Sequence, residues 1–197
     1  MVIHINVRKV VLDIETQNLF RDVGVNDPAA LTISVVGIYD YQTDAYTTYL
    51  ESELSKLWLI LEKTDILIGF NSNHFDIPLL NKYYPGDLTK IKSIDLLHEI
   101  KSASGKRIGL GYIAKATLNR GKIGHGLEAI TWWKNGEVER VRKYCLEDVK
   151  LTKELYEYAR QHGVLKYPDG SQIFDIKIDA SKWEDKIESA MTYTLPF

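Results

Sequence analysis

Three acidic side chains stand where the surrounding pattern calls for apolar residues. Successive residues of a strand point to opposite faces, so Asp13 and Glu15 share one face at the end of the apolar segment 7–15. Asp148 lies in the middle of an apolar helical stripe, one turn after Tyr144. Such carboxylates are costly to desolvate, and a hard divalent cation that binds several anionic oxygens would offset this cost. Two alternatives stay open: the strand emerges into water there, or a nearby Lys or Arg pairs with Asp148.

A third acidic position, Asp76, follows the short segment 66–70. That segment has no polar side chain, which is typical of a strand buried on both faces. Asp76 falls near the start of the next predicted helix, where an Asp ordinarily caps the helix. Considered alone, this segment does not distinguish a functional carboxylate from a helix cap.

The elements that must position these residues form a simple series. Predicted strands lie at 7–15, 31–39, 45–50, 66–70 and 93–96, and predicted helices at 52–62, from 76, at 97–102 and at 137–161. Short connections between the first three strands favour an antiparallel meander. Alternating strands and helices follow, so the predicted fold class is α/β: a mixed sheet with a three-strand antiparallel meander and then β/α alternation, flanked by helices.

Length and composition bound the domain organisation. The 197 residues are 45% apolar and 26% charged, which is typical of a globular domain. We predict one domain over residues 1–163, with a hairpin and tail at 164–197 packed on it. Cys145 is the only cysteine, which excludes an internal disulfide and indicates a cytoplasmic protein. There is no apolar run long enough for a membrane span and no signal-peptide pattern at the N-terminus, so no membrane partner is expected.

Charge is distributed unevenly along the chain. The formal net charge is only −2, yet residues 101–143 hold ten Lys and Arg against three Glu. A phosphate-facing surface would need such a basic stretch, although a solvated lysine-rich face is the alternative. The glycine-rich part of this stretch places its first basic residues on a mobile loop. Candidates for phosphate contact, as a group, are Lys106, Arg107, Lys115, Arg120 and Lys122. Trp132 and Trp133 could stack on bases, but a place in the core is the favoured interpretation.

Taken in order, the three acidic segments resemble the exonuclease motifs of the DEDD superfamily, especially those of the proofreading domain of family B DNA polymerases. The first motif, D-I-E, matches residues 13–15; the second, N-x-x-x-F-D, matches 71–76; the third, Y-x-x-x-D, matches 144–148. The other branch of the superfamily has a histidine five positions before the last Asp, where this chain has Lys143. The resemblance is therefore to the tyrosine (DEDDy) branch, and it covers residues 9–161.

This resemblance implies a ribonuclease H-like fold and a 3′–5′ exonuclease that hydrolyses phosphodiester bonds, with two divalent cations, Mg²⁺ or Mn²⁺, as cofactors. Asp13 would bridge both ions, Glu15 and Asp148 would complete the site of one ion, and Asp76 would serve the other. Tyr144 would orient the attacking water. All five are therefore predicted catalytic residues.

The expected partner is a nucleic-acid 3′ end, with single-stranded DNA favoured over RNA and nucleoside monophosphates as products. Asn71 would contact the substrate or close a β–α loop, and Phe75 would pack beneath the terminal nucleotide or fill the core. The chain resembles a free-standing nuclease or the nuclease subunit of a larger replication or repair assembly. An inactive nucleic-acid-binding module, a structure-specific endonuclease and a structural interaction domain are the alternatives.

Overall fold

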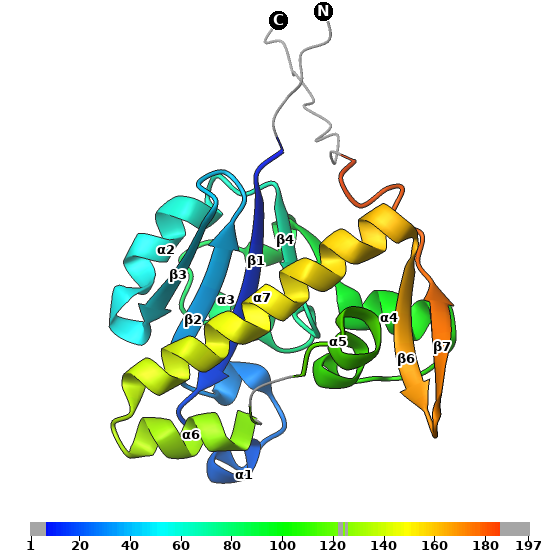
Figure 1. The fold of residues 1–197 in the computed structure, drawn as a ribbon. Coiled ribbons are helices and arrows are strands. Elements are labelled where there is room, and N and C mark those ends of the chain that lie inside the picture. Colours follow the sequence, from blue (N-terminus) through cyan, green and yellow to red (C-terminus); the bar gives the residue numbers. More distant parts are fainter. Residues whose placement is uncertain (1–6, 122–123, 125, 186–197) are drawn as a thin grey trace, which may run out of the picture.

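A five-stranded mixed sheet forms the centre of the protein. The computed structural model describes residues 7–121, 124 and 126–185. The sheet order is β3-β2-β1-β4-β5. The antiparallel meander comprises β1 (Lys9–Thr16), β2 (Ile33–Asp40) and β3 (Ala45–Leu50), and β4 (Ile66–Gly69) and β5 (Lys92–Asp95) run parallel to β1. The predicted fold class is confirmed (Figure 1).

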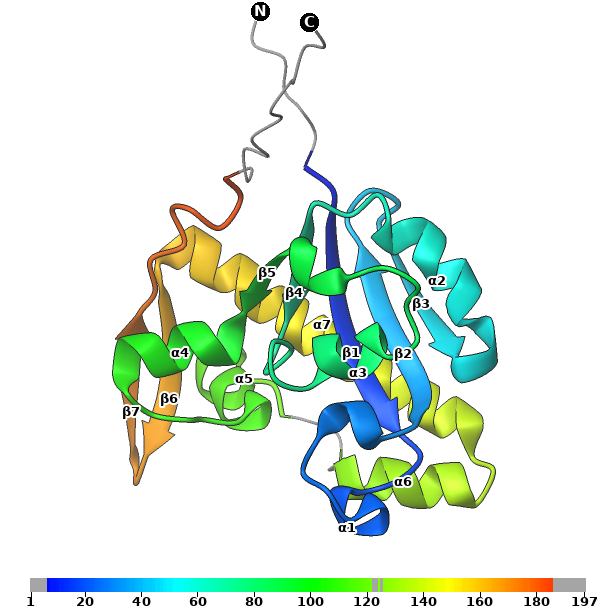
Figure 2. The ribbon, with the colours of Figure 1, turned by 180° about the vertical axis from the view of Figure 1, so that it is seen from behind.

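Helices cover both faces of this sheet, which explains why β2 and β4 are buried along their whole length. The long helix α7 (Val138–His162) crosses one face diagonally, joined there by α4 (Leu96–Ser104) and α5 (Leu110–Leu118) (Figure 1). The other face carries α2 (Leu54–Leu61) and α3 (Asp76–Asn81), seen from behind in Figure 2. Two apolar cores therefore lie on opposite sides of the sheet.

Short elements surround the carboxyl-terminal end of β1. α1 (Phe20–Val23) follows β1 directly, and α6 (Gly126–Lys134) lies beside α7 near the same end of the sheet (Figure 1). Three 3₁₀ turns, at Pro28–Ala30, Glu51–Glu53 and Leu88–Lys90, complete the connections. The sequence pattern predicts neither α1 nor these turns, because three or four residues are too few to show a periodicity.

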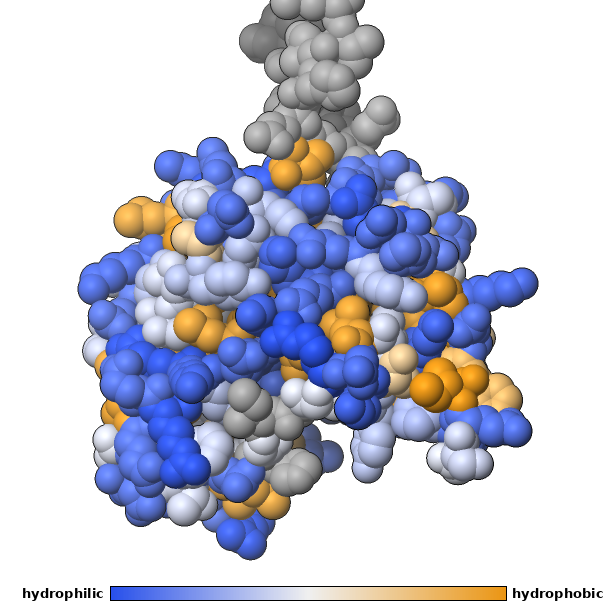
Figure 3. Space-filling model, viewed as in Figure 1, coloured by the Kyte–Doolittle hydropathy of each residue, from blue (hydrophilic) through white to orange (hydrophobic). Residues whose placement is uncertain are grey.

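The predicted hairpin is present as β6 (Val164–Asp169) and β7 (Gln172–Lys177), which follow α7 once Gly163 ends that helix with φ 65°. Leu165, Ile176 and Trp183 are buried in the same core as α5 and α7. Towards its tip the hairpin exposes hydrophobic side chains, Ile173 and Phe174 among them, and Figure 3 shows hydrophobic surface at the lower right, where Figure 1 places the hairpin. Within the described ranges, no helix has the length and apolar character needed to cross a membrane.

Candidate metal centre and active-site pocket

A cluster of carboxylates lies at the end of β1. Asp13, Glu15 and Asp148 each place one oxygen within 4.8 Å of the others. Glu15 and Asp148 are buried and Asp13 is half-buried. Three acids this close, and this far from water, repel one another strongly unless positive charge lies among them. An all-oxygen donor set of this kind fits Mg²⁺ or Mn²⁺ better than a softer metal.

The approach of α7 to the sheet depends on a glycine. Gly37 of β2 pairs with Asp13 of β1 in the sheet register. A Cβ atom at Gly37 would lie 2.8 Å from the sulfur of Cys145 and 3.2 Å from a methyl group of Val149. Because no side chain occupies that space, α7 can lie close enough to the sheet to bring Asp148 to Asp13.

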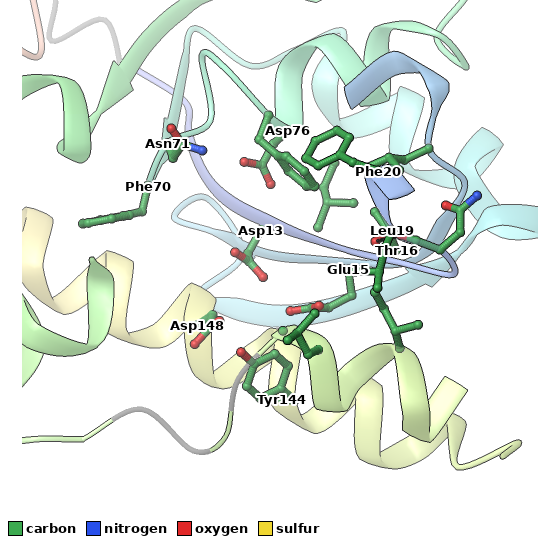
Figure 4. Close-up of a pocket in the computed structure, with 17 residues that line it drawn as sticks. Asp13, Glu15, Thr16, Leu19, Phe20, Phe70, Asn71, Asp76, Tyr144 and Asp148 are labelled. Carbon is green, nitrogen blue, oxygen red and sulfur yellow. Dashed lines mark hydrogen bonds between the residues drawn. The ribbon is translucent and has the colours of Figure 1, made fainter. Parts of the chain in front are cut away.

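Asp76 lies on the other side of Asp13 from the α7 residues, with its carboxylate turned toward Asp13 (Figure 4). It is buried at the start of α3. Burial, reinforced by the negative charges of Asp13 and Asp95, raises the pKa of Asp76 well above its ordinary value of 3.8. A divalent cation beside Asp76 would favour its charged form and reverse this effect. The Asp76 carboxylate therefore faces the cluster without belonging to its tight group of three.

Tyr144 points into the same pocket beside Asp148, one helical turn away (Figure 4). Its ring makes an edge-to-face contact with Trp132 of α6, with centroids 5.7 Å apart. Trp132 is buried, and Trp133 is partly buried against the same cluster. Their place in the core is confirmed, and Trp132 helps to fix the ring of Tyr144.

The carboxylates line a pocket of about 400 Å³. The rest of the lining is largely apolar and comes from β1 and α1 with the segment between them, the loop before α3, and α6. Its apolar members are Leu19, Phe20, Phe70, Phe75, Leu127 and Ile130. Phe75 meets Phe20 edge to face at 6.2 Å, packs on the α3 side of the core and also lines the pocket. Its contact with a terminal nucleotide stays a prediction. Leu127 is 65% exposed, so part of its side chain is open to solvent.

Asn71 lines the pocket and adopts the left-handed backbone conformation, with φ 67°. Its side-chain oxygen accepts a hydrogen bond of 3.1 Å from Arg107. Arg107 lies on the predicted loop between α4 and α5, which brings one residue of the basic stretch to the edge of the pocket.

The other basic candidates are engaged elsewhere. Lys106 pairs with Asp169 at the hairpin tip, at 2.7 Å, and Arg120 pairs with Glu154 of α7. Lys115 donates to Asn119 within its own helical segment. As far as the structure describes the chain, none of the three lines the pocket. Lys122 lies outside the described residues.

Sequence reasoning does not find Phe20, Leu127 or Asp95. Phe20 follows the D-I-E motif by five residues, and this nearness along the chain is the available signal. Leu127 comes from a distant helix and gives no signal. Asp95, a buried acid at the end of β5, accepts the backbone N–H of Asn71 at 2.8 Å.

Comparison with known proteins agrees with this geometry. A sequence model of the RNase H superfamily matches residues 10–160, and the chain belongs to that superfamily. Among solved structures, the family B DNA polymerase from the hyperthermophilic archaeon Pyrobaculum calidifontis is similar in fold, with a TM-score of 0.60 and 17% sequence identity. The match covers 79% of this chain and 25% of the polymerase, so the chain spans about a quarter of that protein's length. No curated protein sequence matches the chain.

The superfamily and the acidic pocket together support a nuclease that acts on nucleic acid with the help of divalent metal ions.

Proposed function

We propose that the protein is a 3′–5′ exonuclease of the DEDDy type that hydrolyses the phosphodiester bonds of nucleic acid, with single-stranded DNA 3′ ends as the favoured substrate. The observation that carries the proposal is the convergence of Asp13, Glu15 and Asp148 within 4.8 Å in the lining of a pocket. The order of the three motifs and the facing position of Asp76 support the same proposal.

Four carboxylates would hold two Mg²⁺ or Mn²⁺ ions. Asp13 would contribute to both, Glu15 and Asp148 to one, and Asp76 to the other. When bound, such ions supply a more acidic water and neutralise the charge of the phosphate. The carboxylates of the chain would hold the ions at the end of β1, inside the pocket.

Tyr144 would orient the attacking water from its place beside Asp148. The water oxygen forms a bond to phosphorus, and the bond from phosphorus to the 3′ oxygen of the preceding nucleotide breaks. The leaving oxygen takes up a proton, and a nucleoside 5′-monophosphate is released. The ring contact with Trp132 supports this role, because it restricts the orientation of the phenol.

The apolar part of the pocket lining would receive the terminal nucleoside. Phe20, Phe75 and Leu127 offer a hydrophobic surface in the same pocket as the carboxylates, which suits a base without selecting its identity. Asn71 and Arg107 lie at the edge of the pocket and would contact the strand that leads to the scissile phosphate. Lys106, Arg120 and Lys122 remain proposed as more distant phosphate contacts.

The direct test uses DNA and RNA oligonucleotides labelled at the 5′ or the 3′ end, with Mg²⁺, Mn²⁺ or EDTA. A 3′–5′ exonuclease releases the 3′ label as a mononucleotide at the earliest times and shortens the 5′-labelled strand in single steps. EDTA and the substitution Asp13→Ala should each abolish both signals. Asp87→Ala, at an acid before the 3₁₀ turn Leu88–Lys90 and outside the pocket lining, is the matched control and should retain activity.

Two results would contradict the proposal. Cleavage of a closed circular single strand would show an endonuclease, because an exonuclease needs an end. Binding without degradation in the presence of either metal would show a nucleic-acid-binding module. Association with a larger replication or repair assembly is a separate question, and pull-down with the Asp13→Ala protein addresses it.

A further inference from the structure

Asp95 is a buried carboxylate that receives four backbone N–H groups. It ends β5 and caps α4, accepting from Leu97 at 3.0 Å and from His98 at 3.3 Å. It also accepts from Asn71 at 2.8 Å and from Asn73 at 3.0 Å, residues more than twenty positions earlier in the chain. Only 4% of the residue is exposed. Helix capping accounts for the first two bonds but not for the last two.

The segment that Asp95 holds is the loop between β4 and α3, residues 70–75. Asn71 has φ 67°, a conformation that is uncommon for a residue with a side chain. The Asn71 carbonyl accepts from His74 and Phe75, so the loop turns directly into α3. Asn71, Phe75 and Asp76 all line the pocket. Their placement therefore depends on one short turn with a strained residue at its start.

The two carboxylate oxygens of Asp95 accept from different donors. Oδ1 accepts from Asn71 and from the capped helix, and Oδ2 accepts from Asn73. A serine would satisfy the helix cap equally well, because Ser and Asp are comparable N-cap residues. A serine hydroxyl has neither the reach nor the second acceptor needed for the loop. The residue type found here is therefore the one that can serve both segments.

We propose that Asp95 is a positioning residue of the active site: its carboxylate holds the 70–75 loop so that Asn71, Phe75 and Asp76 face the substrate. The expected effect of Asp95 on catalysis rests on the proposed nuclease function. Its expected effect on the loop does not. Asp95 acts through the loop and touches neither the metal ions nor the nucleic acid.

The test compares two substitutions at Asp95. Asp95→Ser keeps the cap and removes both loop bonds, whereas Asp95→Asn keeps one oxygen and loses the acceptor for Asn73. Matched controls are Asp87→Ser and Asp87→Asn, because Asp87 is also an N-cap, accepting from Thr89 at 3.0 Å, and lies outside the pocket lining. Each variant is compared with wild type by circular dichroism before it is used.

Two readouts are required. Amide hydrogen exchange of Asn71 and Asn73 should become at least about tenfold faster in Asp95→Ser, because both amides lose their acceptor. In Asp95→Asn the amide of Asn73 loses its acceptor and that of Asn71 keeps it, so the exchange of Asn73 should rise more than that of Asn71. kcat/KM on a single-stranded oligonucleotide should fall more in Asp95→Ser than in Asp95→Asn, by about tenfold or more for Asp95→Ser, because misplacement of catalytic groups is costly. Both Asp87 variants should stay within about twofold of wild type in kcat/KM.

Unchanged exchange in residues 71–76 of both Asp95 variants would overturn the inference. So would faster exchange with kcat/KM equal to that of the Asp87 variants, since the loop would then move without affecting catalysis. If Asp95→Ser does not fold, Asp95→Asn alone decides between these results. Wild-type protein that degrades no substrate contradicts the proposed function, and the exchange measurement still tests whether Asp95 holds the loop.

Discussion

The thiol of Cys145 lies directly against Asp13. Its sulfur is 3.3 Å from the Asp13 carbonyl oxygen and 3.6 Å from the carboxylate atom Oδ2. Burial and the neighbouring carboxylates, Asp13 first among them, raise the pKa of this thiol well above its usual range, so Cys145 is a neutral hydrogen-bond donor at physiological pH. Through this contact α7 lies against β1, and Tyr144 and Asp148 lie on either side of Cys145 in the helix sequence.

The first prediction concerns the space that admits Cys145. Gly37→Ala would place a methyl group 2.8 Å from the Cys145 sulfur and should lower the free energy of unfolding by about 1–3 kcal/mol, as overpacking does. Activity should fall as well, because α7 must move away from Asp13. Urea unfolding and oligonucleotide digestion measure the two effects.

The matched control is Gly121→Ala, where an added Cβ meets nothing within 4 Å. The double substitution Gly37→Ala with Cys145→Ala removes the sulfur that the new methyl group would strike. In the Cys145→Ala background, Gly37→Ala should then lower the free energy of unfolding by less than it does in the wild-type background. If its cost is unchanged, the close contact is not what limits residue size at position 37.

The second prediction concerns the hydroxyl group of Tyr144. Tyr144→Phe keeps the ring that packs on Trp132, so stability and Mn²⁺ affinity should stay close to wild type. kcat should fall by about tenfold to a hundredfold, because the water loses its orienting group while the metal site remains. Single-turnover digestion gives the rate, and calorimetric titration gives the metal affinity.

Tyr158→Phe on the same helix is the control for loss of a tyrosine hydroxyl, and it should digest the substrate at the wild-type rate. Equal rates for Tyr144→Phe and wild type would remove Tyr144 from the mechanism. A large loss of Mn²⁺ affinity would instead assign its hydroxyl to the metal site.

How far the sequence predicts this site depends on the kind of signal each residue leaves. Asp13, Glu15 and Asp148 are recognisable because a charge interrupts an apolar pattern, and such patterns are local. Considered alone, Asp76 resembles a helix cap. It is identified as a candidate site residue only because its motif stands in order with the other two. The sheet, its meander and the long helix follow from the same local periodicity. For α7 the pattern predicts residues 137–161 and the structure has Val138–His162.

Other features depend on contacts between distant segments. Asp95 is a helix cap by every local criterion, and its bonds to Asn71 and Asn73 exist only because β4 and β5 are neighbours in the sheet. Similarly, the basic stretch is predicted from charge alone. That Lys106 is paired with Asp169 while Arg107 reaches the pocket is decided by where the hairpin packs.

The third prediction concerns Asp76 and pH in the absence of metal. Burial, followed by the charge of Asp13, raises the pKa of Asp76 above 3.8, so the folded protein binds this proton more tightly than the unfolded chain does. The resulting stability is fully present below about pH 3.8 and is lost as the pH rises through the higher folded-state pKa. In EDTA, Asp76→Asn should therefore be more stable than wild type at pH 8, because an amide carries no charge to bury.

The expected gain is a higher free energy of unfolding for Asp76→Asn, because the amide removes the cost of burying a carboxylate charge. Urea unfolding at pH 5 and pH 8 measures it, and the difference between the two proteins should be smaller at pH 5. Saturating Mn²⁺ should reverse the order, because a ligand that binds the folded state stabilises it. Asp87→Asn, at an exposed acid whose pKa is lowered by hydrogen bonds from Thr89, should show no gain. An Asp76→Asn protein less stable than wild type at pH 8 in EDTA contradicts the prediction.

The last prediction separates two adjacent cations. Arg107 donates to Asn71 at the edge of the pocket, whereas Lys106 is paired with Asp169 and lies 4.8 Å from the centre of the Tyr167 ring. A phosphate that binds Lys106 must compete with Asp169, whereas in the described part of the chain the hydrogen-bond partner of Arg107 is the neutral amide of Asn71. Arg107→Ala should therefore weaken oligonucleotide binding more than Lys106→Ala does.

The measurement is fluorescence anisotropy with a labelled single-stranded oligonucleotide, in an Asp13→Ala background so that no digestion occurs. Between about 50 mM and about 200 mM salt, the slope of log K against log salt should shrink by about 0.7 when Arg107 is replaced, because one fewer phosphate is neutralised. Lys106→Ala should leave the slope nearly unchanged, and Lys56→Ala, on the far face of the sheet in α2, serves as the control for loss of a surface charge. Equal slopes for Arg107→Ala and Lys106→Ala would mean that proximity to Asn71 does not determine which cation contacts phosphate. If the affinity of every variant is insensitive to salt, the basic stretch is not part of the binding face.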